Sequence, residues 1–461
     1  MDRIDYYLMH EEKPLVELPT LIWALIIFMS FGLVVSLLFL PWYLSLVVFF
    51  ALTLIIGIIL NPFIAVPIYL IGAFIRPMQF APGLVKYQLP VIGAFAVLLA
   101  WLFHIMIYRD FKFPKSSQWK FLFFFTVILI FSSLPHWEYS YFSFFDLIKV
   151  IILYFLVANL VKTEKQIKIV LFFMLFLGVI TAFFGIYQQT HGLGGILRGG
   201  ITRAEGFEGN PNYLAMDLVI LIPVVLCLFV RSGKILLKTL FLSIFILFLT
   251  TIMLTYSRAG ALGSSVVLFL IFWRFFNRRQ KIAYFFLAIA LMLILLPYIP
   301  TAYIERIKSI VNLGEVSIRG RIDGLIVGFW MMKDHPFLGV GVGRWGLNYW
   351  QKAITLPYVQ TKFSKWAHNI FIEIGAQLGI PALIFFLFLL LYLFKDLIFS
   401  RKIFLEKKEL FLSTIAQALE IGLVGFLSCA LFAQAVHLKL FWMLAGLSVS
   451  LKQIALTYRE R

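Results

Sequence analysis

LPVIGAFAVLLAWLFHIMIY, residues 89–108, is a run of 20 residues without Lys, Arg, Asp or Glu. A helix of this length rises about 30 Å, which is the thickness of the hydrocarbon core of a bilayer. Its apolar residues follow one another without the alternation of a membrane β-strand, and this excludes a β-barrel. The run therefore predicts a transmembrane α-helix.

Similar runs recur from Thr20 to near the C-terminus, and the chain of 461 residues is 62% hydrophobic and only 13% charged. Soluble proteins are about one-quarter charged. We therefore predict an all-α, polytopic integral membrane protein with about 12–14 transmembrane helices, in a single transmembrane domain over residues 1–461. The candidate spans are 20–40, 43–60, 62–80, 89–108, 118–134, 144–162, 167–188, 213–231, 237–255, 259–274, 281–300, 380–397, 412–434 and 438–454.

Lys and Arg residues gather after every second candidate span. The clusters lie at residues 109–115, 162–168, 231–238, 274–281, 395–408 and 452–461. Because short cytoplasmic loops are enriched in Lys and Arg, we predict that all six clusters face the cytoplasm, as do both termini. This topology also accounts for the formal net charge of +18, and we expect no binding of nucleic acid.

The loops between these clusters face outward in this topology. They are residues 135–143, a glycine-rich segment at 190–212, a tight turn at 255–260, and a long segment at 301–379. The long segment holds nine cations against four acids between residues 301 and 367, which long loops tolerate because they are translocated regardless of charge. Helix-like apolar spacing from Ile322 to Met332 predicts that residues 301–379 form a long helical loop that caps the outward face.

Arg203, Arg258, Arg321 and His368 all fall on the outward face. Charged groups cost free energy near a bilayer, so four of them on one face suggest an anionic substrate. Histidine is the side chain best suited to accept a proton near neutral pH, and His368 would lie at the membrane surface. We interpret the other histidines as structural: His10, His104, His136, His191, His335 and His437.

The sequence gives no indication of a metal or disulfide site. No two histidines have the spacing of metal ligands, and no acidic cluster accompanies them, so we expect no metal site. Cys227 and Cys429 lie in separate apolar runs and are interpreted as small buried side chains.

Each of these segments also admits a structural interpretation. Asn212 could cap the helix that follows it, and Arg258 could extend from a helix end to the membrane surface. Arg321 could form an ion pair with Asp323 or Glu315, and either Arg319 or Arg321 could bind an anion.

The run Gly339-Val-Gly341-Val-Gly343 follows a helix-like stretch rather than a strand. It therefore predicts a close-packed turn rather than a dinucleotide-binding loop.

Together, these segments resemble the bacterial O-antigen ligase and polymerase superfamily over residues 190–461, with the motifs between Arg203 and about Leu451. The resemblance rests on the order and spacing of Arg203…Asn210-Pro-Asn212, Ser257-Arg258, Gly320-Arg321…Pro336-x-x-Gly-x-Gly and His368-Asn369…Gly379. It implies a metal-independent glycosyltransferase without a cofactor, in the bacterial inner membrane with its active site facing the periplasm. Its donor would be a glycan on undecaprenyl diphosphate.

The resemblance also implies roles for individual residues. Arg258 and Arg321 would hold the diphosphate and stabilise the charge on the leaving group, and His368 would activate the acceptor hydroxyl. The remaining candidates would shape the substrate site: Arg203, Asn210, Asn212, Arg319 and Asn369. Of the two arginines near Gly320, Arg321 is preferred because it directly follows that glycine.

Three acceptors remain open within the resemblance: lipid A–core for a ligase, a second lipid-linked glycan for a polymerase, and a protein for an O-oligosaccharyltransferase. Membrane lipids would surround the chain. An alternative of another class is a flippase or transporter for the same lipid. Ion-coupled carriers usually need charges near the bilayer midplane, and the main candidates are few: Arg76, Asp146, Lys149, Asp217 and Glu420.

Overall fold

The computed structural model describes residues 42–74, 89–109, 113–196, 200–275, 316–361 and 366–460, together with isolated positions between 24 and 34. Nearly all of this is helical, in agreement with the predicted all-α fold. The long apolar helices are α3 (Trp42–Leu60), α4 (Ala65–Phe74), α5 (Leu89–Tyr108), α6 (Gln118–Ser133), α7 (Trp137–Leu160), α8 (Glu164–Thr190), α9 (Pro211–Arg231), α10 (Ile235–Leu254), α11 (Arg258–Phe275), α17 (Ile380–Glu406), α18 (Leu410–Ala430) and α19 (Lys439–Glu460).

Among the described residues, eight helical stretches are long and apolar enough to cross a membrane. One of them, Gln118–Leu160, contains both α6 and α7. Of the predicted spans, 62–80 corresponds to the shorter helix α4, whereas 281–300 lies outside the described residues, as does most of 20–40. The polytopic architecture is confirmed.

The prediction of a loop at residues 135–143 is wrong, because most of this segment is helical. Residues Leu134–His136 form a single 3-10 turn, and α7 begins at Trp137. Pro135 occupies the start of this turn, where a proline costs no helical hydrogen bond. The proline therefore joins two helices instead of opening a loop.

Burial identifies the centre of the bundle. In their most apolar windows, α9 and α19 bury 78% of their residues and α10 buries only 17%. Helices that are apolar on all sides and buried lie among other helices, whereas apolar helices with exposed side chains face lipid. α9, α18 and α19 thus form the core, and α10 lies at its periphery.

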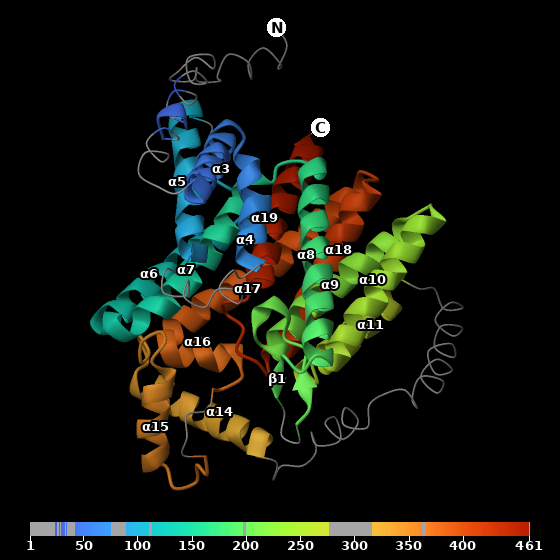
Figure 1. Ribbon diagram of the computed structural model, residues 1–461. Helices are drawn as coiled ribbons and strands as arrows, with labels where there is room; N and C mark the ends of the chain where they lie inside the picture. The colour runs from blue at the N-terminus through green and yellow to red at the C-terminus, as the bar shows by residue number, and fades with distance from the viewer. Residues whose placement is uncertain are drawn as a thin grey trace.

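The two ends of the bundle differ in chemistry. At one end, Arg231 donates hydrogen bonds to Thr414 Oγ1 (2.8 Å) and to the Leu410 carbonyl (3.0 Å), and Arg274 contacts Glu420 at 2.7 Å. The opposite end carries α14 (Val316–Asp334), α15 (Trp345–Thr355), α16 (Ile370–Leu378) and the short strands β1 (Gly195–Ile196) and β2 (Thr202–Arg203) (Figure 1). α19 ends at the other end of the molecule (Figure 1).

The described part of the long segment at 301–379 is helical, as predicted, and α14 covers the apolar spacing at 322–332. α14 and α15 share a small core of their own, which includes Val327, Met331, Trp345 and Tyr349. This core holds the two helices together beneath α16.

The glycine run at 339–343 forms the predicted close-packed turn. Gly339, Gly341 and Gly343 all have positive φ. The Val340 and Gly341 amides donate to the carbonyls of Ala376 and Gln377, at 2.9 and 3.1 Å. The turn therefore fixes the C-terminal end of α16 to the end of α14.

Gly339→Ala is expected to destabilise the protein. A Cβ there would lie 2.3 Å from the carbonyl carbon of Gln377, on a backbone with φ of +64°. The left-handed backbone costs about 1–2 kcal/mol and the overpacking about 1–3 kcal/mol. Thermal unfolding of the purified protein measures the loss. Gly233→Ala is the control, because a Cβ there meets nothing within 4 Å. Equal melting temperatures for both variants would contradict the expectation.

Candidate active site

The first group of candidate residues gathers where β2 meets the ends of α9, α10 and α11. Arg203 Nε donates a hydrogen bond to the carbonyl of Thr255 (2.7 Å), three residues before Arg258. Ser257 Oγ donates to Asn212 Oδ1 (2.8 Å). Arg203, Asn212 and Arg258 therefore come together although 55 positions separate the first from the last.

The capping interpretation of this segment holds for a different residue. Asn210, not Asn212, caps α9: its side-chain oxygen accepts from the amide of Asn212 at 2.9 Å. Pro211 occupies the first helical position, and this makes the residue before it the cap. Asn212 instead contacts Ser257, whose Oγ accepts from the Gly260 amide at 3.1 Å and so caps α11.

Arg258 is the first residue of α11 and is only 7% exposed. Its side chain is therefore buried and does not simply extend to the membrane surface, as the structural interpretation assumed. A helix N-terminus carries a partial positive charge and free N–H groups, and a guanidinium there adds a full charge. This corner of the bundle is suited to an anion.

The second group lies where α14 packs against the segment before α16. A Cβ on Gly324 would lie 2.7 Å from the carbonyl oxygen of Trp366 and 3.0 Å from Cα of Ala367. Residues three apart share a face of a helix, so Arg321 lies on the face that Gly324 presents to this segment. His368 follows directly, and Arg321 and His368 thus come from adjoining elements.

Asp323, one of the two acidic partners considered for Arg321, forms its ion pair with Arg319. Arg319 Nε lies 3.4 Å from Oδ1 of the buried Asp323, and Arg319 Nη2 donates to the carbonyl of Tyr358 at 3.0 Å. Glu315, the other partner considered, lies outside the described residues. Arg319 is therefore tied to the fold, and the choice of Arg321 as the anion-binding residue stays a prediction.

His368 has a left-handed backbone with φ of +47°. A non-glycine residue in this region costs on the order of 1–3 kcal/mol and persists where its surroundings hold it. Asn369, next to it, caps α16: its Oδ1 accepts from the amides of Phe371 (3.0 Å) and Ile372 (3.1 Å). Its Nδ2 donates to the carbonyl of Leu431 at 3.2 Å. Asn369 therefore fixes the position of the neighbouring His368. The predicted contact of Asn369 with a substrate stays a prediction.

The end of α18 connects the two groups. Cys429 Sγ donates to the carbonyl of Ala259, beside Arg258, at 3.1 Å. Two residues further on, the carbonyl of Leu431 accepts from Asn369, beside His368. Arg258 and His368 therefore flank the same end of α18, at the end of the bundle opposite the Arg231 and Arg274 contacts.

A buried ion pair at this end was not predicted from the sequence. Lys439 Nζ, at the start of α19, lies 2.7 Å from Glu208 Oε1, and both side chains are almost fully buried. Glu208 stands between the candidates Arg203 and Asn210, and Lys439 opens an apolar span. An isolated charge in an apolar run is the signal that could have identified them.

A polar cavity of about 270 Å³ adjoins both groups. Trp366, two residues before His368, and Tyr213, directly after Asn212, line it. The cavity also contains Glu373 of α16, whose pKa burial raises to about 8. Arg258, Arg321 and His368 do not line the cavity, which therefore lies beside the candidate residues rather than among them.

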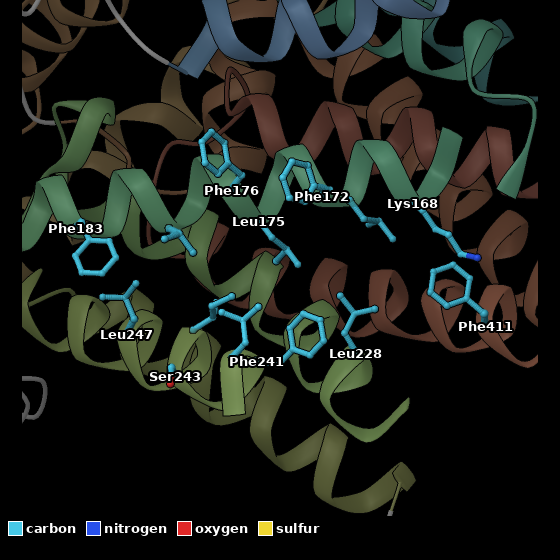
Figure 2. A pocket seen from close by; sticks show the side chains of 14 residues that line it. Lys168, Phe172, Leu175, Phe176, Phe183, Leu228, Phe241, Ser243, Leu247 and Phe411 are labelled. Atoms are coloured by element: carbon cyan, nitrogen blue, oxygen red, sulfur yellow. The ribbon is translucent and has the colours of Figure 1, made fainter. Parts of the chain in front are cut away.

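A larger hollow of about 650 Å³ lies between α8 and α10, away from the candidate residues (Figure 2). It extends from Lys168 and Phe411 at one end to Phe183 and Leu247 at the other (Figure 2). Its lining is almost entirely Leu, Ile, Val and Phe, and several of these side chains are exposed. Such an apolar surface groove suits a lipid chain, not the polar chemistry of group transfer.

In the described part of the chain, no three His, Cys, Asp or Glu side chains lie close enough to hold a metal ion. The functional groups that the structure brings together at this end are arginines, a histidine, amides and a buried carboxyl. Such a set can bind an anion and move a proton.

Comparison with known proteins bears on residues 242–387, which match the family model described as O-antigen ligase. This stretch runs from α10 into α17 and contains Arg258, Arg321 and His368. No curated protein matches the chain. The match agrees with the family that the sequence motifs resemble. The matched segment contains three of the four motifs, those around Arg258, Arg321 and His368. The match supports the O-antigen ligase/polymerase superfamily and, in general terms, a role of the O-antigen ligase type.

Proposed function

We propose that this protein is a glycosyltransferase that moves a glycan from undecaprenyl diphosphate to an acceptor hydroxyl, as an O-antigen ligase or polymerase. The observation that carries the proposal is that Arg258 and His368 flank the end of α18, with Arg321 on the face of α14 that packs against the segment leading to His368. The family match over residues 242–387 supports the reaction class. A diphosphate requires cationic donors, and a hydroxyl nucleophile requires a base.

In this proposal, Arg258 and Arg321 bind the diphosphate through charge-assisted hydrogen bonds. The bond between the sugar C1 and the diphosphate oxygen breaks, and the acceptor oxygen forms a new bond to C1. The acceptor proton passes to His368, and undecaprenyl diphosphate leaves with its additional negative charge. The two arginines stabilise that charge more strongly in the transition state than in the bound donor, and this difference accelerates the reaction.

We propose that the reaction takes place on the periplasmic face of the inner membrane. Three basic clusters of the described chain lie before α8, at the end of α9 and at the end of α17. All are at the end opposite the candidate site, and the positive-inside rule assigns that end to the cytoplasm. The C-terminal end of α19 lies there too, and an even number of spans would bring the N-terminus to the same side.

Purified protein in detergent, given undecaprenyl-diphosphate-linked glycan, tests the proposal. The readout is release of free undecaprenyl diphosphate. Release that requires lipid A–core indicates a ligase, and glycan lengthening without lipid A–core indicates a polymerase. Release only with a protein acceptor indicates an O-oligosaccharyltransferase. If no acceptor supports release while the lipid crosses a liposome membrane, the protein is a flippase and the proposal is wrong.

Arg258→Gln is expected to slow release by about 10²–10³-fold, because it removes a donor to the developing charge. Arg274→Gln is the matched control. It removes an arginine near the other end of the same helix, where the partner Glu420 keeps a second contact with Arg401. Release by this control should be nearly unchanged. A similar loss in both variants would indicate damage to α11 instead of loss of a donor.

A further inference from the structure

The polar cavity beside the candidate residues, here called the Glu373 pocket, is built from five separate parts of the chain, one of which is the glycine turn at 339–343 through Val342. α7 contributes Ser143 and Asp146, and α9 contributes Tyr213. α16 contributes Glu373 and Gln377, and Trp366 comes from the segment before it. The turn between α18 and α19 contributes Gln434 and His437. Its position at the junction of these elements makes it part of the fold rather than a surface irregularity.

Two polar atoms in this pocket have no hydrogen-bond partner among the described residues. Glu373 is 6% exposed and its Oε2 makes no hydrogen bond, and the same is true of Oε1 of Gln434. A buried polar group without a partner costs about 1–3 kcal/mol, so a site that keeps two of them is suited to a ligand that satisfies them. In contrast, Oε1 of Gln377 accepts a hydrogen bond from the Gly343 amide at 2.7 Å.

The groups in the pocket match a neutral ligand. None of its described lining residues is Lys or Arg, and Asp146 is paired with Lys149 on α7. With its raised pKa of about 8, Glu373 is largely protonated at pH 7 and can both donate and accept hydrogen bonds. The amide of Gln434 can do the same. The lining therefore offers no guanidinium or ammonium group of its own to a phosphate, and the proposed function assigns the diphosphate to Arg258 and Arg321.

Aromatic rings complete the lining. The rings of Tyr213 and His437 meet edge to face at 5.0 Å, and Trp366 stacks on the buried Trp345 at 6.1 Å. These contacts hold the rings in place. A sugar presents hydroxyls around its edge and apolar C–H groups on its faces, which match hydrogen-bonding side chains and aromatic rings respectively.

The size of the pocket limits the ligand. Its 270 Å³ would hold roughly nine waters at about 30 Å³ each. Pockets for drug-sized ligands occupy about 300–1,000 Å³. The pocket therefore has room for one sugar ring rather than for an oligosaccharide.

We propose that the Glu373 pocket binds one neutral sugar ring of a substrate, beside the bond that reacts. This inference rests on the proposed glycosyl transfer. The ring belongs either to the donor glycan or to a glycan acceptor, and the two sources present the same chemistry to the pocket. Glu373 and Gln434 contact its hydroxyls, and Trp366 contacts a C–H face.

Two replacements of Glu373 in the full-length protein provide the test. Glu373→Met keeps the volume of the side chain and removes its hydrogen bonds, and it also removes a buried polar group, so folding should not suffer. Glu373→Gln keeps a neutral group that donates and accepts. We expect Glu373→Met to raise KM by roughly tenfold, with a smaller effect on kcat, and Glu373→Gln to restore most of the loss.

Separate titrations of donor and acceptor identify the source of the sugar. A rise in KM for the donor alone assigns the ring to the donor glycan, and a rise for the acceptor alone assigns it to the acceptor. If Glu373→Met changes neither KM, or if Glu373→Gln is as defective as Glu373→Met, the pocket does not bind the sugar.

Direct binding separates this inference from the proposed function. The probes are undecaprenyl diphosphate without a glycan, and the free glycan released from the donor by mild acid. Each is measured by the rise in melting temperature that a ligand produces. Glu373→Met should lose the response to the free glycan and keep the response to undecaprenyl diphosphate, and Arg258→Gln should do the reverse. If the wild type performs no transfer, the glycan response and its dependence on Glu373 still decide the inference. An equal glycan response in the wild type and Glu373→Met would overturn it.

Discussion

His368→Asn should slow glycan transfer by about 10²–10⁴-fold, the usual contribution of a general base. Asparagine is the appropriate replacement because His368 has a φ of +47°. Asparagine tolerates the left-handed region better than other non-glycine residues, so the variant loses the imidazole without added backbone strain. The adjacent cap of α16 by Asn369 should remain intact.

Single-turnover release of undecaprenyl diphosphate measures this effect, and binding of undecaprenyl diphosphate by thermal shift accompanies it. We expect release to fall and binding to remain, because Arg258 and Arg321 are unchanged. The control is His335→Asn, at the end of α14, whose side chain is exposed. Transfer at the wild-type rate by His368→Asn would exclude His368 as the base.

Breaking the Glu208–Lys439 pair should produce the largest loss of stability. Their charged atoms lie 2.7 Å apart in a buried site, with side chains 4% and 7% exposed. Removing one partner leaves an uncompensated buried charge, which typically costs about 3–5 kcal/mol. We therefore expect Glu208→Gln and Lys439→Met each to lower the melting temperature strongly.

The double variant Glu208→Gln/Lys439→Met completes a double-mutant cycle. It should recover much of the loss, because no charge remains buried without its partner. The matched control is Lys115→Met, which breaks an exposed pair with Glu460 and should change the melting temperature little. If the two single losses simply add in the double variant, the pair does not stabilise the fold.

Local sequence signals predicted most of the fold. The apolar runs identified α5, α8, α9 and α19, because bilayer thickness and helical rise together fix the length of a spanning helix. The glycine run at 339–343 was predicted as a close-packed turn, and all three glycines have positive φ. In both cases the relevant physics lies within a few neighbouring residues.

The wrong details also have local explanations. A proline is favoured at the first helical position, so Pro211 makes Asn210 the cap of α9 and leaves Asn212 available to Ser257. Residues four apart share a helix face and residues two apart do not, so Asp323 pairs with Arg319 and not with Arg321.

The Glu373 pocket and the Glu208–Lys439 pair could not be derived from the sequence alone. The two charged residues are 231 positions apart, and the pocket combines α7, α9, α16 and the turn after α18. No local rule relates such positions, because packing of the whole bundle sets their distances. The roles of Arg258, Arg321 and His368 therefore remain proposals.

The turn between α18 and α19 contacts both halves of the proposed site. Leu431 holds the histidine side through Asn369, while Lys439 holds the β2 side through Glu208. His437 packs against Tyr213 between them. If the diphosphate and the acceptor favour the same position of this turn, each raises the affinity for the other by the same factor, as thermodynamic linkage requires. The two substrates would then bind cooperatively, and an acceptor affinity measured without donor would be lower than the affinity in the presence of donor.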